Sequence, residues 1–169
     1  LYGFTSTDHR PPRVYNLYLS DVPNPYFPPG KRTHLPVAAK QGGYRVLENG
    51  PIEVQQDFII GLRAYDFLDG NANHCGIYSM QLFVDDSLYF HSLANEFSFA
   101  GSRYINAQVD LKRLRTQNQR VIWLYRQPGN YFSALAPAPP DGLVRLRDTA
   151  PHTLRVVLED FAGNRTEIS

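Results

Sequence analysis

The chain has 169 residues, with 17 Lys and Arg, 16 Asp and Glu, and a net charge of +1. This length corresponds to one domain or two small ones and allows a sizeable core without disulfide bonds. The balanced charge argues against nucleic-acid binding, which normally requires a basic stripe. No apolar run reaches the roughly 18 residues of a membrane-spanning helix, so no membrane span is expected.

Residues 1–12 are predicted to form a linker arm from an upstream domain. Tyr2 and Phe4 make this arm apolar, and Pro11 and Pro12 separate it from the first patterned segment. The sequence has neither an initiator Met nor a signal peptide, and it stops inside a predicted strand. We therefore expect it to be a piece of a longer protein.

Residues 13–19 alternate between polar and apolar side chains and predict a strand. In a regular strand Val14 and Tyr18 share one face, and Leu17 and Leu19 share the other. Prolines on both sides delimit the strand, because proline cannot donate to a sheet ladder.

Two hairpins are predicted next. Asn49 and Gly50 favour a type I′ turn, so residues 44–47 are expected to pair with residues 52–54. Asp85 and Asp86 are turn residues within an alternating segment, and they predict a second hairpin over residues 77–90.

Three further segments alternate or are rich in β-branched and aromatic residues: 57–65, 120–125 and 153–159. Their inward-facing side chains predict one shared core, made with those of the second hairpin: Phe58, Ile60, Leu62, Met80, Leu82, Trp123, Leu154, Val156 and Leu158. Residues 136–142 contain three prolines and predict an exposed loop. The pattern of residues 103–120 fits either a strand or a short helix.

Many short strands separated by Gly, Pro and Asn turns are typical of an all-β fold. The order of hairpins and long connections favours an antiparallel β-sandwich of the immunoglobulin-like or fibronectin-like type over a barrel. We expect this sandwich to comprise residues 13–169, with a long insertion around residues 91–147.

The sequence shows no catalytic, cofactor or metal site, so none is predicted. The five histidines, which lack metal-ligand spacing, are His9, His34, His74, His91 and His152. Cys75 follows His74, and neighbours on an extended chain point to opposite sides, so the pair is not expected to act as a nucleophile and base. The basic residues around Lys112 and Arg120 are interpreted as a solvated face.

The loop of residues 66–76 presents Asp and Asn oxygens at alternating positions, which is faintly similar to a calcium loop. It lacks the glycine position and the distal glutamate of an EF-hand, and the same residues are common in plain turns. A plain loop is the interpretation here, and calcium binding stays an open alternative. The aromatic pairs Tyr26–Phe27 and Tyr131–Phe132 are interpreted as packing at the ends of the sandwich rather than as sugar-stacking platforms.

Residues 154–164 resemble the closing hairpin of bacterial immunoglobulin-like domains, in which a strand runs into Asp-x-x-Gly-Asn. Nearly the whole chain resembles the region that follows the peptidase domain in lysostaphin-type (LytM-like) zinc endopeptidases of Gram-negative bacteria. The short motifs that carry this resemblance are Leu1–Phe4, His9–Pro12, Gly76–Ser79, Phe97–Phe99, Arg103–Asn106 with Asp110, and Pro128–Asn130. The zinc motifs of that family lie in its upstream domain, and none of them is found in this sequence.

The resemblance implies a non-catalytic accessory module that positions or regulates an upstream peptidase acting on peptidoglycan, or that binds an envelope partner. It also implies a periplasmic or cell-envelope location. No cofactor is expected for this chain. The alternative is an adhesion or assembly module of a surface protein, which uses sheet edges or loops for binding.

Overall fold

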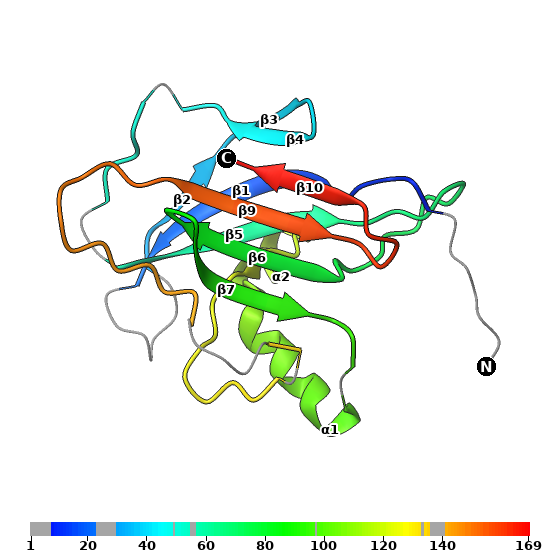
Figure 1. Ribbon diagram of the computed structural model, residues 1–169. Helices are drawn as coiled ribbons and strands as arrows, with labels where there is room; N and C mark the ends of the chain where they lie inside the picture. Colours follow the sequence, from blue (N-terminus) through cyan, green and yellow to red (C-terminus); the bar gives the residue numbers. More distant parts are fainter. Residues whose placement is uncertain are drawn as a thin grey trace.

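The computed structural model describes residues 8–22, 30–48, 50–54, 57–96, 98–132, 134–135 and 141–169. It is mostly β-structure, and its two sheets pack together in a β-sandwich arrangement (Figure 1). The prediction of an all-β sandwich is therefore confirmed at this level. None of the helices in the described part of the chain has the length and apolar character needed to cross a membrane.

The first sheet has four strands, in the order β2 (Arg32–Leu35), β1 (Arg13–Asp21), β5 (Phe58–Tyr65) and β8 (Ile122–Trp123). The register of β1 against β5 shifts between Val14 and Asn16. A bulge of this kind inserts one extra residue and reverses the alternation beyond it. Val14 consequently shares the inner core with Leu17, whereas Tyr18 belongs to a second cluster, so the prediction that Val14 and Tyr18 share a face is wrong.

The second sheet has six strands, in the order β3 (Val37–Lys40), β4 (Gly43–Val46), β10 (Arg165–Ile168), β9 (Leu154–Glu159), β6 (Ser79–Val84) and β7 (Ser87–Leu93). All its pairings are antiparallel except β4 with β10, which is parallel. The hairpin predicted at Asp85 and Asp86 is confirmed, and both residues have positive φ angles, of 47° and 63°.

The hairpin predicted around Asn49 and Gly50 is wrong. β4 pairs with the preceding strand β3 instead, through a turn in which Gly42 has a φ of +78°. The other edge of β4 is occupied by β10, so no edge is left for residues 52–54. This pairing also requires glycine at position 43, where a Cβ atom would lie only 2.0 Å from the Glu167 carbonyl oxygen. Asn49 itself lies outside the described residues.

The main core lies between the sheets and includes seven of the nine predicted residues: Phe58, Ile60, Leu62, Met80, Leu82, Val156 and Leu158. Leu154 is only partly buried, because it begins its strand at the margin of the core. Trp123 is buried in a separate cluster with Ile59, Tyr18 and Val121. The prediction of a single shared core is therefore wrong for Trp123, because β5 is covered on both faces.

The cover on the outer face of β5 comes from the segment between β7 and β9. This segment contains α1 (Phe99–Ser102), the 3-10 helix η1 (Arg103–Gln108) and α2 (Leu111–Gln117), so the helical alternative applies to most of residues 103–120. In the view of Figure 1, α1 lies below the strands, whereas α2 lies at the level of β6. The guanidinium of Arg113 lies 4.2 Å from the ring centre of Tyr18, which packs α2 against β1.

Candidate functional site

Three segments that are far apart in the sequence meet at one end of the sandwich. They are the amino-terminal segment (residues 8–12), the loop of residues 66–76 between β5 and β6, and the β9–β10 turn (residues 160–164). All three lie at the right-hand end in Figure 1. Of the four buried aspartates among the described residues, three lie at this end, which is therefore the candidate site.

The amino-terminal segment is fixed to the sandwich by hydrogen bonds from the β9–β10 hairpin. The Asn164 side-chain amide donates to the Asp8 carbonyl oxygen at 3.0 Å, and the Thr166 hydroxyl donates to the Pro12 carbonyl oxygen at 2.7 Å. Pro12 is fully buried, and Thr166 is buried as well. The direction in which the chain approaches β1 is therefore set by the fold.

The same segment holds the loop of residues 66–76. The Arg10 guanidinium donates to the carbonyl oxygens of Leu68 and Asn71, both at 3.2 Å, and it lies 5.3 Å from the ring centre of Phe67. His9 contributes a contact between its Nδ1 and the Asp69 carboxylate at 2.9 Å. The loop is closed at its base by paired backbone hydrogen bonds between Asp66 and Cys75.

Three carboxylates converge where these segments meet. Asp8, Asp66 and Asp160 are 8%, 5% and 1% exposed, and one oxygen of each lies within 4.8 Å of those of the other two. Asp160 accepts two hydrogen bonds from Asn164, one from the backbone N–H and one from the side-chain amide. Asp8 accepts one from the Arg10 backbone N–H at 3.1 Å, whereas Oδ1 of Asp66 is buried without any hydrogen-bond partner.

The electrostatics of this cluster are unfavourable for three ionised acids. Two unit charges about 5 Å apart repel by on the order of 3 kcal/mol at an effective dielectric constant near 20. Removal from water raises the pKa of Asp66 above its ordinary value, and the neighbouring carboxylates of Asp160 and Asp8 raise it further. A backbone hydrogen bond with Phe67 opposes this rise in the pKa, and the Arg10 charge opposes it to a smaller extent, but together they do not cancel it.

No Lys, Arg or His in the described ranges forms an ion pair with Asp8, Asp66 or Asp160. The two histidines in these segments are engaged elsewhere. His9 contacts Asp69, whose pKa is lowered mainly by that hydrogen bond, and His74 stacks on the Tyr65 ring with 4.5 Å between ring centres. The cluster is therefore made of oxygen atoms alone.

The sequence predicts no site residue, and no pattern in it indicates this cluster. Asp66 belongs to an expected loop and Asp160 to an expected turn, whereas Asp8 belongs to no motif. The Asp-x-x-Gly-Asn turn carried a usable signal, because Asn164 connects Asp160 to the amino-terminal segment. In this turn Gly163 has a positive φ, of 91°, whereas Asn164 is not among the residues with positive φ.

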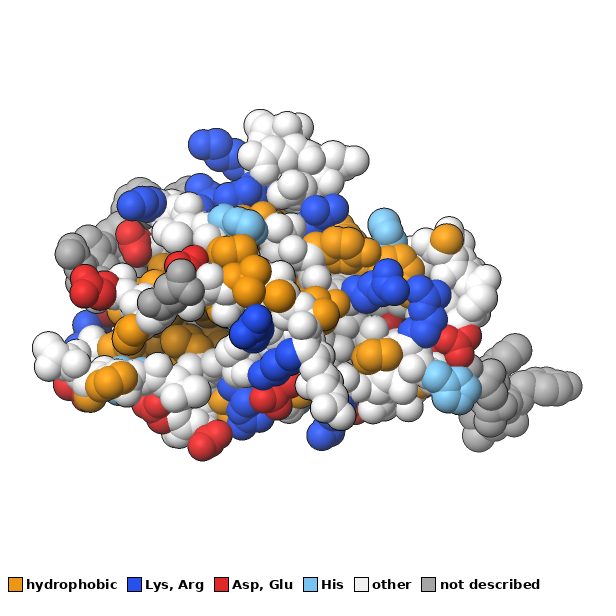
Figure 2. Space-filling view, turned by 90° about the horizontal axis from the view of Figure 1, so that it is seen from above, with side chains coloured by type: hydrophobic (Ala, Val, Ile, Leu, Met, Phe, Trp, Pro, Cys, Tyr) orange, Lys and Arg blue, Asp and Glu red, His pale blue; other side chains and the backbone are white. Residues whose placement is uncertain are grey.

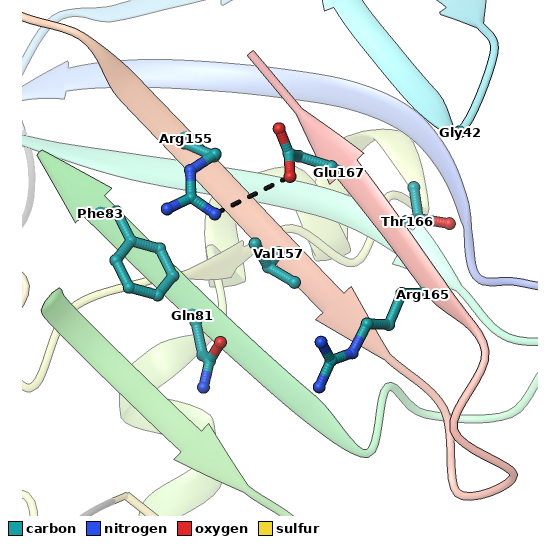
Figure 3. A pocket seen from close by; sticks show the side chains of 8 residues that line it. All are labelled: Gly42, Gln81, Phe83, Arg155, Val157, Arg165, Thr166 and Glu167. Atoms are coloured by element: carbon teal, nitrogen blue, oxygen red, sulfur yellow. Dashed lines mark ion pairs between the residues drawn. The ribbon is translucent and has the colours of Figure 1, made fainter. Parts of the chain in front are cut away.

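The outer face of the six-stranded sheet has a hollow, which is shown in Figure 3. Its charges are already paired with one another. Arg155 lies 3.8 Å from Glu167 and 4.4 Å from the ring centre of Phe83, and Arg165 lies 2.8 Å from Glu159. This hollow is consequently a set of cross-strand contacts and holds no group that stands ready for a reaction.

The wider surface shows no dominant charge. On the face seen in Figure 2, basic side chains are spread along the molecule with acidic ones beside them at both ends. Tyr131 is 76% exposed and Phe132 is buried, so only the second of this aromatic pair packs inward. Tyr26 and Phe27 lie outside the described residues.

Comparison of the chain with protein-family models, with curated proteins and with solved structures finds no match.

Proposed function

We propose that this chain is a non-catalytic accessory module of a peptidoglycan endopeptidase in the periplasm or cell envelope. In this role it positions or regulates a zinc peptidase domain that precedes it, or it binds an envelope partner. We further propose that the sandwich is of the immunoglobulin-like type, since the chain crosses repeatedly from one sheet to the other and the early strand β4 pairs with the last strand, β10.

The observation that carries the proposal is the fixed amino-terminal segment. A module that positions a preceding domain must transmit its own orientation through the connecting chain. Asp8 and Pro12 are each hydrogen-bonded to the β9–β10 hairpin, and Arg10 is bonded to the loop of residues 66–76. A free tail would lack this set of long-range contacts.

The residues that resemble the peptidase-associated region have structural roles, which favours an accessory function over catalysis. Asp110 caps α2 by accepting from the Arg113 N–H and lies 2.7 Å from Arg32. Asn130 accepts from the Phe132 N–H at 3.0 Å and so shapes a buried turn. The Asp110 carboxylate and the Asn130 amide oxygen are thus used in local structure, whereas Nδ2 of Asn130 is buried without a hydrogen-bond partner.

The test combines an activity assay with a binding assay. The purified chain is expected to release no soluble fragments from peptidoglycan. It is also expected to bind the separately expressed lysostaphin-type peptidase domain in calorimetry, and trimming Leu1–Thr7 is expected to weaken this binding about tenfold, or about 1.4 kcal/mol.

Hydrolysis by the chain alone would contradict the non-catalytic assignment. The positioning role would be contradicted if the chain neither bound the peptidase domain nor changed the cleavage of peptidoglycan by that domain. Binding to another surface protein without effect on the peptidase would favour the adhesion or assembly alternative.

A further inference from the structure

The carboxylates of Asp8, Asp66 and Asp160 have a geometry that suits a shared cation. Two oxygens bound to one calcium ion at 2.3–2.6 Å can be separated by at most about 5 Å. The separations in the cluster stay within 4.8 Å, so all three acids can reach one ion together.

A second observation points to a ligand. Asp66 is 95% buried, given its exposure of 5%, and its Oδ1 accepts no hydrogen bond. Buried carboxylate oxygens in folded proteins nearly always have a donor or a cation as partner. Asp160 has its donors in Asn164, so the unpartnered oxygen of Asp66 is the one that calls for a positive charge.

The donor set selects the kind of cation. It contains oxygen atoms only, because Cys75 and the rings of His9 and His74 are not members of the cluster. Oxygen ligands suit Ca²⁺ and Mg²⁺ rather than Zn²⁺. The three acids come from three separate segments, and each can offer one or two oxygens, which fits the six to eight flexible ligands of calcium better than the strict octahedron of magnesium.

We propose that one Ca²⁺ ion binds between Asp8, Asp66 and Asp160. The ion joins the amino-terminal segment, the loop of residues 66–76 and the β9–β10 turn at a single point. Its effect is to fix the amino-terminal segment against the sandwich, whatever the activity of any domain that precedes it. Calcium binding goes beyond the accessory role and does not depend on it.

The test uses the whole chain after dialysis against EDTA. Calorimetric titration with CaCl₂ is expected to show one binding site with a Kd at or below about 1 mM, the range of extracellular calcium modules. The thermal midpoint is expected to rise saturably, by roughly 5 °C or more at a hundred times the Kd. MgCl₂ at the same concentrations is expected to give a smaller rise.

Two variants locate the site. Asp66→Asn keeps the size of the side chain and is expected to lower calcium affinity at least tenfold and to abolish the thermal shift. Asp8→Asn is expected to weaken binding at least tenfold as well, and it serves if Asp66→Asn does not fold. Asp86→Asn is the matched control, because Asp86 is 91% exposed in the β6–β7 turn, and it is expected to bind as the parent chain does.

Three results would overturn the proposal. One is the absence of both heat and thermal shift with up to 10 mM CaCl₂, about ten times the weakest expected Kd. Another is an equal response of the parent chain and the folded Asp66→Asn or Asp8→Asn variant, which would indicate general screening. The third is an equal response to magnesium and calcium. None of these measurements involves a peptidase domain, so failure here leaves the accessory function to be tested separately.

Discussion

Three ionisable groups lie together at each end of β9. At one end the acids are exposed and paired with a histidine, and at the other they are buried without an ion-pair partner among the described residues. Before Leu154, His152 lies between two exposed carboxylates, with Nδ1 2.5 Å from Asp85 and Nε2 2.7 Å from Asp148. After Glu159, Asp160 is buried with two other acids and no ion-pair partner among the described residues.

The consequence for the pKa values differs in sign. Hydrogen bonds with His152 lower the pKa of Asp85 and of Asp148, and the same bonds raise the pKa of His152. At the other end, desolvation raises the pKa of Asp66. Whether neighbouring acids have lowered or raised pKa values therefore depends on their burial and on the charge of their partner.

The largest effect is expected from the buried middle of β9, which joins the two ends. Leu158→Ala should lower the free energy of unfolding by about 3 kcal/mol, since Leu158 is fully buried and its removal leaves a cavity. Leu154→Ala should cost less than half as much, because Leu154 is partly buried. Urea unfolding followed by Trp123 fluorescence measures both losses. The NMR signals of His152 and of the Asn164 side-chain amide report on the two ends, and separate transitions of these signals would show that β9 does not couple them.

The next effect concerns the link at the acidic end. Asn164→Ala removes the amide that joins Asp160 to the Asp8 carbonyl oxygen, at 2.8 Å and 3.0 Å. We expect a loss of about 2 kcal/mol in the free energy of unfolding, the range for hydrogen bonds that involve a charged group. Asn95→Ala, on an exposed contact of 3.5 Å, is the control and should cost under about 0.5 kcal/mol. Equal losses in the two variants would contradict the role of Asn164.

The His152 end predicts a pH dependence that His152→Gln removes. The folded pKa of His152 is raised above 6.5, so its contribution to stability is complete below that value and is lost as the pH rises through the folded pKa. The pKa values of Asp85 and Asp148 lie below 3.8, so their contribution is lost as the pH falls through them. Calorimetric melting should show the parent more stable than the variant between about pH 4 and 6.5, with a gap that narrows above. A gap that widens toward pH 9 would contradict this sign.

The smallest effect is expected from the solvent-exposed pair of Asp86 and Arg155, which are 3.1 Å apart. Asp86→Asn should change the free energy of unfolding by less than about 0.5 kcal/mol, because water screens an exposed pair and ordering its side chains opposes the attraction. The small change should disappear in 1 M salt, where the Debye length is about 3 Å. A decrease of 2 kcal/mol or more in the free energy of unfolding, measured by chemical denaturation, would show that this exposed pair contributes substantially to stability.

The sequence predicted those parts of the fold in which neighbouring residues decide the structure. The alternation of Val156 and Leu158 located β9, and Asp85 with Asp86 located a hairpin. The Asn49–Gly50 signal failed because strand pairing depends on which edges are free, and β10 takes the edge of β4 from a distant part of the chain. Local turn preference could not reveal that competition.

The second core and the acidic cluster depend on tertiary structure. Ile59 could not be recognised as buried, because its cover comes from the segment that carries Val121 and Trp123. The carboxylates of Asp8, Asp66 and Asp160 come from near the start, the middle and the end of the sequence, and no spacing rule connects them. Taken alone, each of these acids lies in a short stretch whose composition is ordinary for a turn or loop.

The position of β10 has a consequence for the order of folding. This strand lies inside the six-stranded sheet, between β4 and β9, although it is the last strand along the chain. During synthesis the β3–β4 hairpin and the β6–β7–β9 part can form, but they share no neighbour until residues 165–168 have emerged. Pairings over such a sequence distance are entropically costly and form slowly. Pulse-labelled hydrogen exchange should therefore show the amides that join β4 to β10 gaining protection after those of the β3–β4 and β6–β7 hairpins.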